Sequence, residues 1–352
     1  MTGDRGPRRA SRARDVAIRV AGLVAVAAIL WWSLTRLVSW DDVVSAVAGL
    51  DACDWGILAL VAAIRLAIEP LLLMAATPKL RWPRALPAFL APAAAASVVP
   101  GPSDIAARYA MFRTWGYSSA QTSASVLLVF LYTTFAKVAL PVVAAGVYLL
   151  FGRSDPQLET VAIIAAGVLA GAVALFVLLF RSDRMARRLG YAAGAAARRV
   201  AGWFRISTPE TLAADLAERA AHFREHTGDV VRSRTHLAAG SAALGQAALF
   251  AVLLASVRAT GITSGQLDWI AVFAAFALVQ LLTSIPITPS GLGVAEAAYI
   301  TLLTAAATGV PAGRVAAAAI IYRLLSWVIV IPLGALAWAW WTARGRTGRK
   351  GG

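Results

Sequence analysis

The chain contains 352 residues, of which 59% are hydrophobic and only 14% are charged, and its mean hydropathy is +0.71. A soluble domain carries about a quarter charged residues, so this composition excludes an ordinary soluble protein and indicates an all-α, polytopic membrane protein. The net charge of +15 lies mainly in the connections between apolar runs, as membrane topology signals do. We therefore expect no nucleic-acid partner.

The first connections alternate between basic and acidic. A basic N-terminus, residues 1–15, precedes an apolar run at about 16–38, and the connection 39–54 contains four aspartates and no Lys or Arg. A second apolar run at 55–76 leads into a connection with three basic residues between 79 and 84. Because cytoplasmic loops are enriched in Lys and Arg, we expect a cytoplasmic N-terminus and an external acidic loop in a cell membrane protein.

The next apolar run is interrupted. Residues 85–115 are apolar at first, break at a Pro-Gly sequence, and resume as a helix-like run with charged residues. The break consists of Pro100, Gly101 and Pro102. Such breaks free backbone groups that lipid cannot satisfy, so they occur inside protein or beside a wet cavity. We expect a re-entrant hairpin here, followed by full spans at about 118–151 and 157–180.

The second half repeats this order after an Arg-rich connector at 181–235, which we expect to be cytoplasmic and largely helical. A span at 236–260 precedes a second broken hairpin at 269–309, and a last span at 311–342 leads into the basic tail 343–352. The second break includes Pro289, Ser290, Gly291 and Gly293. The same topology rule places both termini in the cytoplasm.

The two broken hairpins occupy corresponding positions in two membrane halves, 16–180 and 236–342, and the rule places them on opposite sides. Interrupted segments in matching positions of two halves are the sequence signature of an inverted repeat in a transporter. We therefore predict about six full spans plus two re-entrant hairpins, arranged as an inverted repeat.

Both breaks resemble motifs of a known family. The first block, P-G-P-S-D-x-x-x-R, and the second, P-I-T-P-S-G-L-G-V-A-E followed by Tyr322-Arg323, are similar to motifs of the lysylphosphatidylglycerol synthase transmembrane family. The resemblance implies a flippase-like protein, here a free-standing membrane part, since the chain leaves no room for an aminoacyltransferase domain. Asp104 stands where the family usually has Glu, which is a departure in the first half.

Charged residues within the apolar runs are the candidate site. A charge at the bilayer centre costs about 2.5 to 3.5 kcal/mol on insertion scales, so such residues usually face the protein interior or a cavity. The substrate-binding candidates are Arg323, Glu296, Arg65, Glu69, Asp104, Arg108, Lys137 and Tyr322. Arg323 is the preferred phosphate ligand, because its guanidinium presents a planar pair of donors. Structural ion pairs at Arg65–Glu69 and Asp104–Arg108 are equally compatible with the spacing.

The expected function is translocation of an anionic lipid, either a phospholipid or a polyprenyl-phosphate-linked headgroup, with membrane lipids as partners. No catalytic residue, cofactor or metal site is predicted. Two alternatives stay open: a membrane assembly or regulatory subunit that binds a protein partner through 181–235, and a polytopic enzyme acting on a lipid-linked substrate. The oligomeric state is not predicted.

Overall fold

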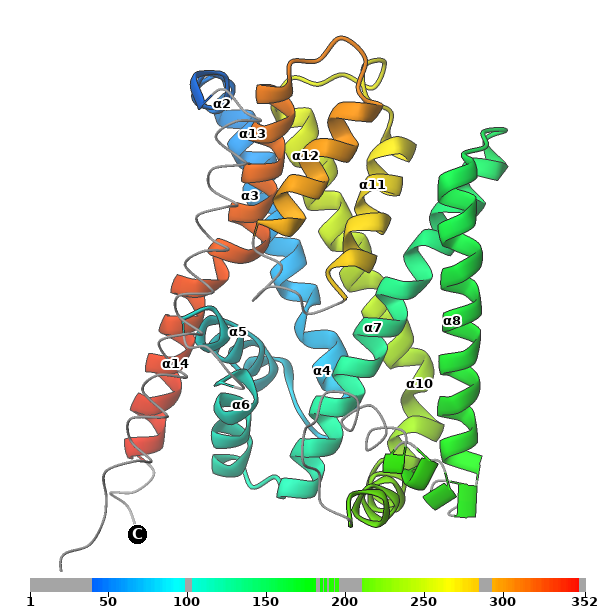
Figure 1. Cartoon of the computed structure of the whole chain (residues 1–352). Coiled ribbons are helices and arrows are strands. Elements are labelled where there is room, and N and C mark those ends of the chain that lie inside the picture. The colour runs from blue at the N-terminus through cyan, green and yellow to red at the C-terminus, as the bar shows by residue number, and fades with distance from the viewer. Residues whose placement is uncertain are drawn as a thin grey trace, which may run out of the picture.

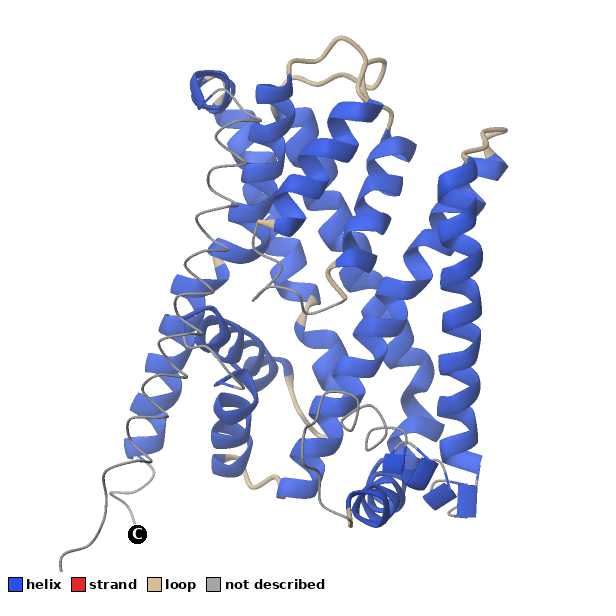
Figure 2. Cartoon of the chain, in the orientation of Figure 1, coloured by secondary structure: helices blue, strands red, loops and turns tan. Residues whose placement is uncertain are grey.

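The computed structural model describes residues 40–98, 103–181, 211–284 and 293–347, with short helical pieces between 184 and 195. All regular elements in these residues are helices (Figure 2). Five are long and apolar enough to span a membrane: Ala52–Ala76, Ser119–Leu150, Pro156–Leu178, Ser233–Ala259 and Ala312–Ala343. The prediction of a polytopic helical membrane protein is confirmed, and the predicted first span at 16–38 lies outside the described residues.

The connections fall at two ends of the bundle (Figure 1). We call the end with residues 77–81 and the end of α14 the basic end; it is at the bottom of Figure 1. The α7–α8, α10–α11 and α12–α13 connections lie at the opposite end. The predicted alternation of the chain between two sides is therefore present, and which side faces the cytoplasm stays a prediction.

The predicted span at 55–76 is a broken helix. It consists of α3 (Ala52–Ile68) and α4 (Pro70–Ala76), which meet at Glu69. The cause is Pro70, which has no backbone N–H and whose ring clashes with the carbonyl one turn earlier. Asp51 caps the start of α3 and accepts from the backbone N–H of Asp54 at 2.8 Å.

Four short helices form two hairpins. The first contains α5 (Trp82–Val98) and α6 (Ser103–Thr114), and the second contains α11 (Trp269–Leu282) and α12 (Val294–Ala306). The longest, α5, has 17 residues, which at about 1.5 Å per residue is shorter than a hydrocarbon core of about 30 Å.

The two hairpins enter from different ends of the bundle. Figure 1 shows α5 and α6 near the basic end and α11 and α12 near the opposite end. This is the arrangement that an inverted repeat predicts. The repeat itself stays a prediction, because the residues at both turns, 99–102 and 285–292, lie outside the described residues.

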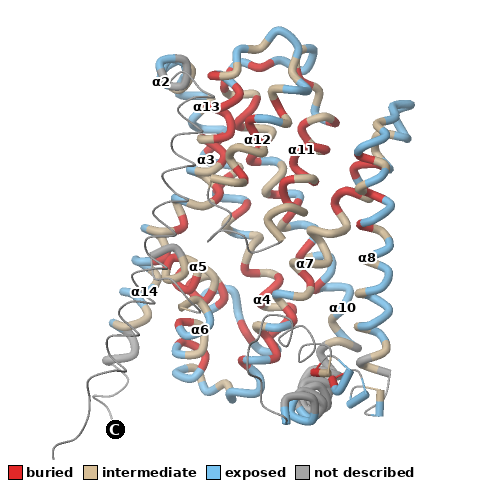
Figure 3. Tube along the Cα trace, in the orientation of Figure 1, coloured by how far each residue is buried: buried red, intermediate tan, exposed pale blue. Residues whose placement is uncertain are grey.

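Two long helices, α7 (Ser119–Leu150) and α8 (Pro156–Arg181), stand side by side beside α10 (Leu212–Ala259). Figures 1 and 3 show the first part of α10 lying across the basic end, while the rest runs up through the bundle. Most described residues of the predicted connector 181–235 are helical, as expected. The position of this connector on a membrane surface stays a prediction.

The last span is also less regular than predicted. It consists of α13 (Ala312–Arg323), a π-helical segment (Leu324–Val328) and α14 (Val330–Thr347). The backbone N–H of Ile329 donates to the carbonyl of Leu324 at 2.9 Å, five residues back. Pro332 explains the irregularity, because it cannot donate to the carbonyl of Val328 and crowds it. Such π-helical turns often occur at functional sites.

The core lies towards the opposite end, around α13 (Figure 3). Five consecutive α13 residues are fully buried: Val315, Ala316, Ala317, Ala318 and Ala319. A helix that is buried on all sides needs small side chains, because neighbouring helices must approach it closely. Small residues allow α13 to contact α2 (Trp40–Ala48), α10 and α12 at once.

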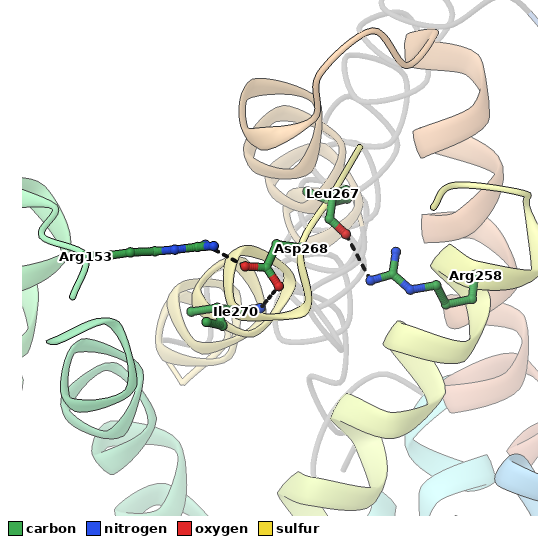
Figure 4. Close-up of polar contacts among 5 residues, drawn as sticks. All are labelled: Arg153, Arg258, Leu267, Asp268 and Ile270. Atoms are coloured by element: carbon green, nitrogen blue, oxygen red, sulfur yellow. Dashed lines mark hydrogen bonds and ion pairs between the residues drawn. The ribbon is translucent and has the colours of Figure 1, made fainter. Parts of the chain in front are cut away.

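Polar contacts fix the start of α11 at the opposite end of the bundle (Figure 4). Arg153 donates to the carboxylate of Asp268 at 2.6 Å, and Asp268 accepts from the backbone N–H of Ile270 at 3.3 Å. Arg258 donates to the carbonyl of Leu267 at 2.9 Å. Asp268 therefore caps α11 and ties it to the α7–α8 turn.

Replacing Asp268 with Asn separates these two roles. Asn still caps a helix but loses the charge, and the Arg153 side chain is 47% exposed. We expect Asp268→Asn to lower the free energy of unfolding by less than about 1 kcal/mol, with no difference left in high salt. Thermal unfolding in detergent at two salt concentrations checks this. A loss that is equally large in high salt would contradict the ion-pair explanation.

Candidate functional site: a cationic cavity between the hairpins

A cavity of about 610 Å³ lies between α6, α7 and the end of α11. Residues of both hairpins line the cavity, since α6 belongs to the first hairpin and α11 to the second. Arg108, Lys137 and Asp104 line it. Its hydroxyl side chains are Tyr109, Ser123, Thr133, Thr134, Thr283 and Ser284. The cavity combines cations with hydrogen-bond donors, which is the chemistry that a phosphate requires.

Lys137 lies near the middle of α7 and connects three elements. Its Nζ donates to Oγ1 of Thr283, at the end of α11, at 3.4 Å. It also interacts electrostatically with Glu69, at the junction of α3 and α4. The carbonyl end of a helix carries partial negative charge, so the end of α11 favours a cation at this point.

Arg108 contributes the second cation from α6. Its Nε is buried and has no hydrogen-bond partner in the described part of the chain. Asp104, one turn earlier, interacts with it electrostatically. A buried donor without a partner costs about 1 to 3 kcal/mol, so an anion that accepts from Arg108 would be bound favourably.

Arg65, on α3, is a further buried cation outside the cavity lining. Its side chain is buried, and Nη2 donates to Oε1 of Glu69 at 3.1 Å. Its Nε and Nη1 have no hydrogen-bond partner within the described ranges. Tyr322 of α13 lies close enough to interact with Arg65 electrostatically and packs edge-to-face on Tyr299, with ring centroids 5.2 Å apart. The Arg65–Glu69 ion pair, one of the two interpretations that the spacing left open, is therefore present.

Arg323 is held by the second hairpin. Its Nε donates to Oε1 of Glu296 at 2.5 Å, and Oε2 of Glu296 accepts from the backbone N–H of Gly293 at 2.6 Å. The guanidinium carbon also lies 5.6 Å from the centre of the Trp327 ring. Gly293 has φ +79°, which an L-residue with a side chain rarely adopts. Glu296 thus fixes both the start of α12 and Arg323.

Most of the predicted residues lie in two groups, and within each group the residues are near one another. Asp104, Arg108 and Lys137 share the cavity, and Glu69 links Lys137 to Arg65. Glu296, Arg323 and Tyr322 lie together around α12 and α13 and do not line this cavity. Six predicted loop residues lie outside the described residues: Pro100, Gly101, Pro102, Pro289, Ser290 and Gly291.

Sequence reasoning missed the hydroxyl lining. Thr133 and Lys137 are one helical turn apart and share a face of α7, so a search along that face would have found Thr133. Thr283 and Ser284 carry no such signal, because their position depends on how the second hairpin meets α7.

A comparison with known protein families shows the family of the chain. The family description "Lysylphosphatidylglycerol synthase TM region" matches residues 19–334. The chain belongs to this family. The match covers both hairpins and the whole of the cavity. No curated protein matches the chain.

Proposed function

We propose that this member of the lysylphosphatidylglycerol synthase TM family moves an anionic lipid headgroup across the bilayer through the cavity between its hairpins. The observation that carries the proposal is the position of Arg108 and Lys137, from two different elements, on one cavity. Charged residues within spanning segments mark substrate pathways by default, because they are costly in hydrocarbon. The membrane family to which the chain belongs supports a role in lipid handling.

The cavity chemistry favours a phosphate group. Arg108 offers planar N–H donors and Lys137 a compact positive charge, and hydroxyl side chains line the same cavity. Asp104 and Glu69 balance part of this charge, which allows the cations to be buried before the headgroup binds. Phospholipids and polyprenyl-phosphates share the phosphate, so both are substrates of the proposed kind.

The wall of the cavity also has an apolar side. Ile105, Leu127 and Phe130 line it, and these residues are 41%, 40% and 63% exposed. Apolar residues beside a polar cavity suit a lipid whose head enters while its tails stay in hydrocarbon. In this mechanism the headgroup contacts Arg108 and Lys137, and the tails pass along Ile105, Leu127 and Phe130.

The remaining predicted residues receive positioning roles in this proposal. Glu296 holds Arg323 and the start of α12, and Arg65 holds Glu69 near Lys137. Rocking of one membrane half against the other would open the cavity to each side in turn, as in transporters built from inverted repeats. Direct contact of Arg323 with the headgroup, as the sequence suggests, remains an alternative within the same proposal.

Neutralising the two cavity cations tests the proposal. In vesicles that contain a fluorescent phosphatidylglycerol, we expect Arg108→Gln and Lys137→Gln each to reduce headgroup translocation at least tenfold, since each removes a charge-assisted contact worth about 1.5 to 3 kcal/mol. The measurement is the rate at which label in the inner leaflet becomes accessible to an external quencher.

Arg314→Gln is the matched control, because Arg314 is an exposed cation on α13 at the opposite end and lies away from the cavity. It should leave the rate unchanged. Thermal unfolding shows whether each variant is folded. Folded Arg108→Gln and Lys137→Gln proteins with the wild-type rate would overturn the proposal.

A further inference from the structure

A second cavity of about 670 Å³ lies on the other side of α7, between α7, α8 and α10. Its wall is almost entirely apolar and rich in aromatic rings: Tyr132, Phe135, Phe176 and Phe180. The polar groups among its lining residues are the hydroxyls of Tyr132 and Thr235, which hydrogen bond to each other at 3.0 Å. We call this cavity the α8 groove.

The α8 groove is separate from the cationic cavity. Lys137 and Thr133 lie on one face of α7, whereas Phe135 and Ala139 point to another face and line the α8 groove. A ligand in the α8 groove therefore does not reach the headgroup position of the proposed transport path.

Protein side chains leave part of the groove wall uncovered. Val173 and Val177 of α8 line it and are still 41% and 58% exposed. Both belong to a helix that spans the membrane, where hydrocarbon is the surrounding solvent. An apolar chain that lies along this wall covers it without any unsatisfied polar group.

At the basic end, arginines are close in sequence to residues that line the groove. Val231 and Thr235 of α10 line it, and the half-buried Arg234 lies between them in sequence. Exposed Arg184, Arg187 and Arg188 belong to the helical pieces at the foot of α8 (Figure 1). Arg184, Arg187, Arg188 and Arg234 supply positive charge at this end. This charge is complementary to an acidic lipid headgroup.

We propose that the α8 groove is a binding site for an acyl chain of an anionic phospholipid from the leaflet at the basic end. The chain lies against the aromatic wall, and the phosphate lies beside Arg234. This lipid is a bound structural ligand and not the transported one, so the inference stands independently of the transport proposal.

Filling the groove tests this inference. Ala239 and Ala243 line the groove from α10 and are exposed, so Ala239→Trp and Ala243→Trp fill it without disturbing a buried position. Leu237→Trp is the control, because Leu237 is 51% exposed on α10 and does not line the groove. The measurement is native mass spectrometry of full-length protein taken from vesicles with equal phosphatidylglycerol and phosphatidylcholine.

We expect wild-type protein and Leu237→Trp to retain one phosphatidylglycerol in preference to phosphatidylcholine, and both alanine variants to lose it. Arg234→Gln should retain a lipid but reduce the preference about fivefold, as expected for one charge near an anionic surface. Arg314→Gln, which changes an exposed cation that lines neither cavity, should retain the lipid unchanged. Equal retention of both lipids by wild type, or normal retention by Ala239→Trp, would overturn the inference.

Discussion

Glu296→Ala is expected to lower the free energy of unfolding by about 3 to 5 kcal/mol, the usual cost of breaking a buried ion pair from one side. The substitution removes the carboxylate that holds Arg323 at 2.5 Å and the backbone N–H of Gly293 at 2.6 Å. Both side chains of the pair are only 15% exposed, so water replaces the lost contacts poorly. Thermal or denaturant unfolding in detergent measures the loss.

A double-mutant cycle distinguishes the ion pair from a general packing effect. If Glu296 and Arg323 act together, the Glu296→Ala/Arg323→Ala protein should be clearly more stable than the two single losses added together predict. Additive losses would show that the pair is not coupled. Transport assays on the same proteins would then show whether Arg323 has a further role.

Gly334→Ala is expected to destabilise the protein by about 1 to 3 kcal/mol, as overpacking of a close helix contact does. A Cβ at Gly334 would overlap the carbonyl oxygen of Leu90 and the side chain of Ala94. The contact joins α14 to α5 of the first hairpin, so the added methyl group pushes the hairpin away from the last span. Thermal unfolding measures the stability loss.

Gly167→Ala on α8 is the matched control, because no atom lies within 4 Å of the position that its Cβ would occupy. The same change of residue should there be neutral or stabilising, since Ala is the better helix former. Equal unfolding midpoints for the two variants would contradict the close approach of α14 and α5.

The sequence predicted those parts of the architecture that depend on the length of apolar runs and on short local motifs. Apolar run length predicted the five spans that the structure describes, and the Pro-Gly breaks predicted helices too short to cross. The spacing of Arg65 and Glu69 was compatible with an ion pair or with a ligand contact, and the structure contains the ion pair. These features depend on residues that are near one another in the chain.

The structure added what depends on contacts between distant residues. The partner of Arg323 is Glu296, 27 residues earlier, and no local pattern indicates that these two side chains meet. The same is true of Lys137 and Thr283, which are 146 residues apart. The sequence predicted only the extent of the spans at 55–76 and 311–342 and not their breaks, because hydropathy does not register how one proline changes backbone hydrogen bonding.

The π-helical segment at 324–328 has a mechanical consequence. The part of the last span before it contacts α12 of the second hairpin, and the part after it contacts α5 of the first. Trp341 adds a bond to the first hairpin by donating to Oγ1 of Thr114 at 3.0 Å. The last span thus contacts both hairpins, one on each side of the π-helical segment, so a bend at this segment would tilt one hairpin relative to the other.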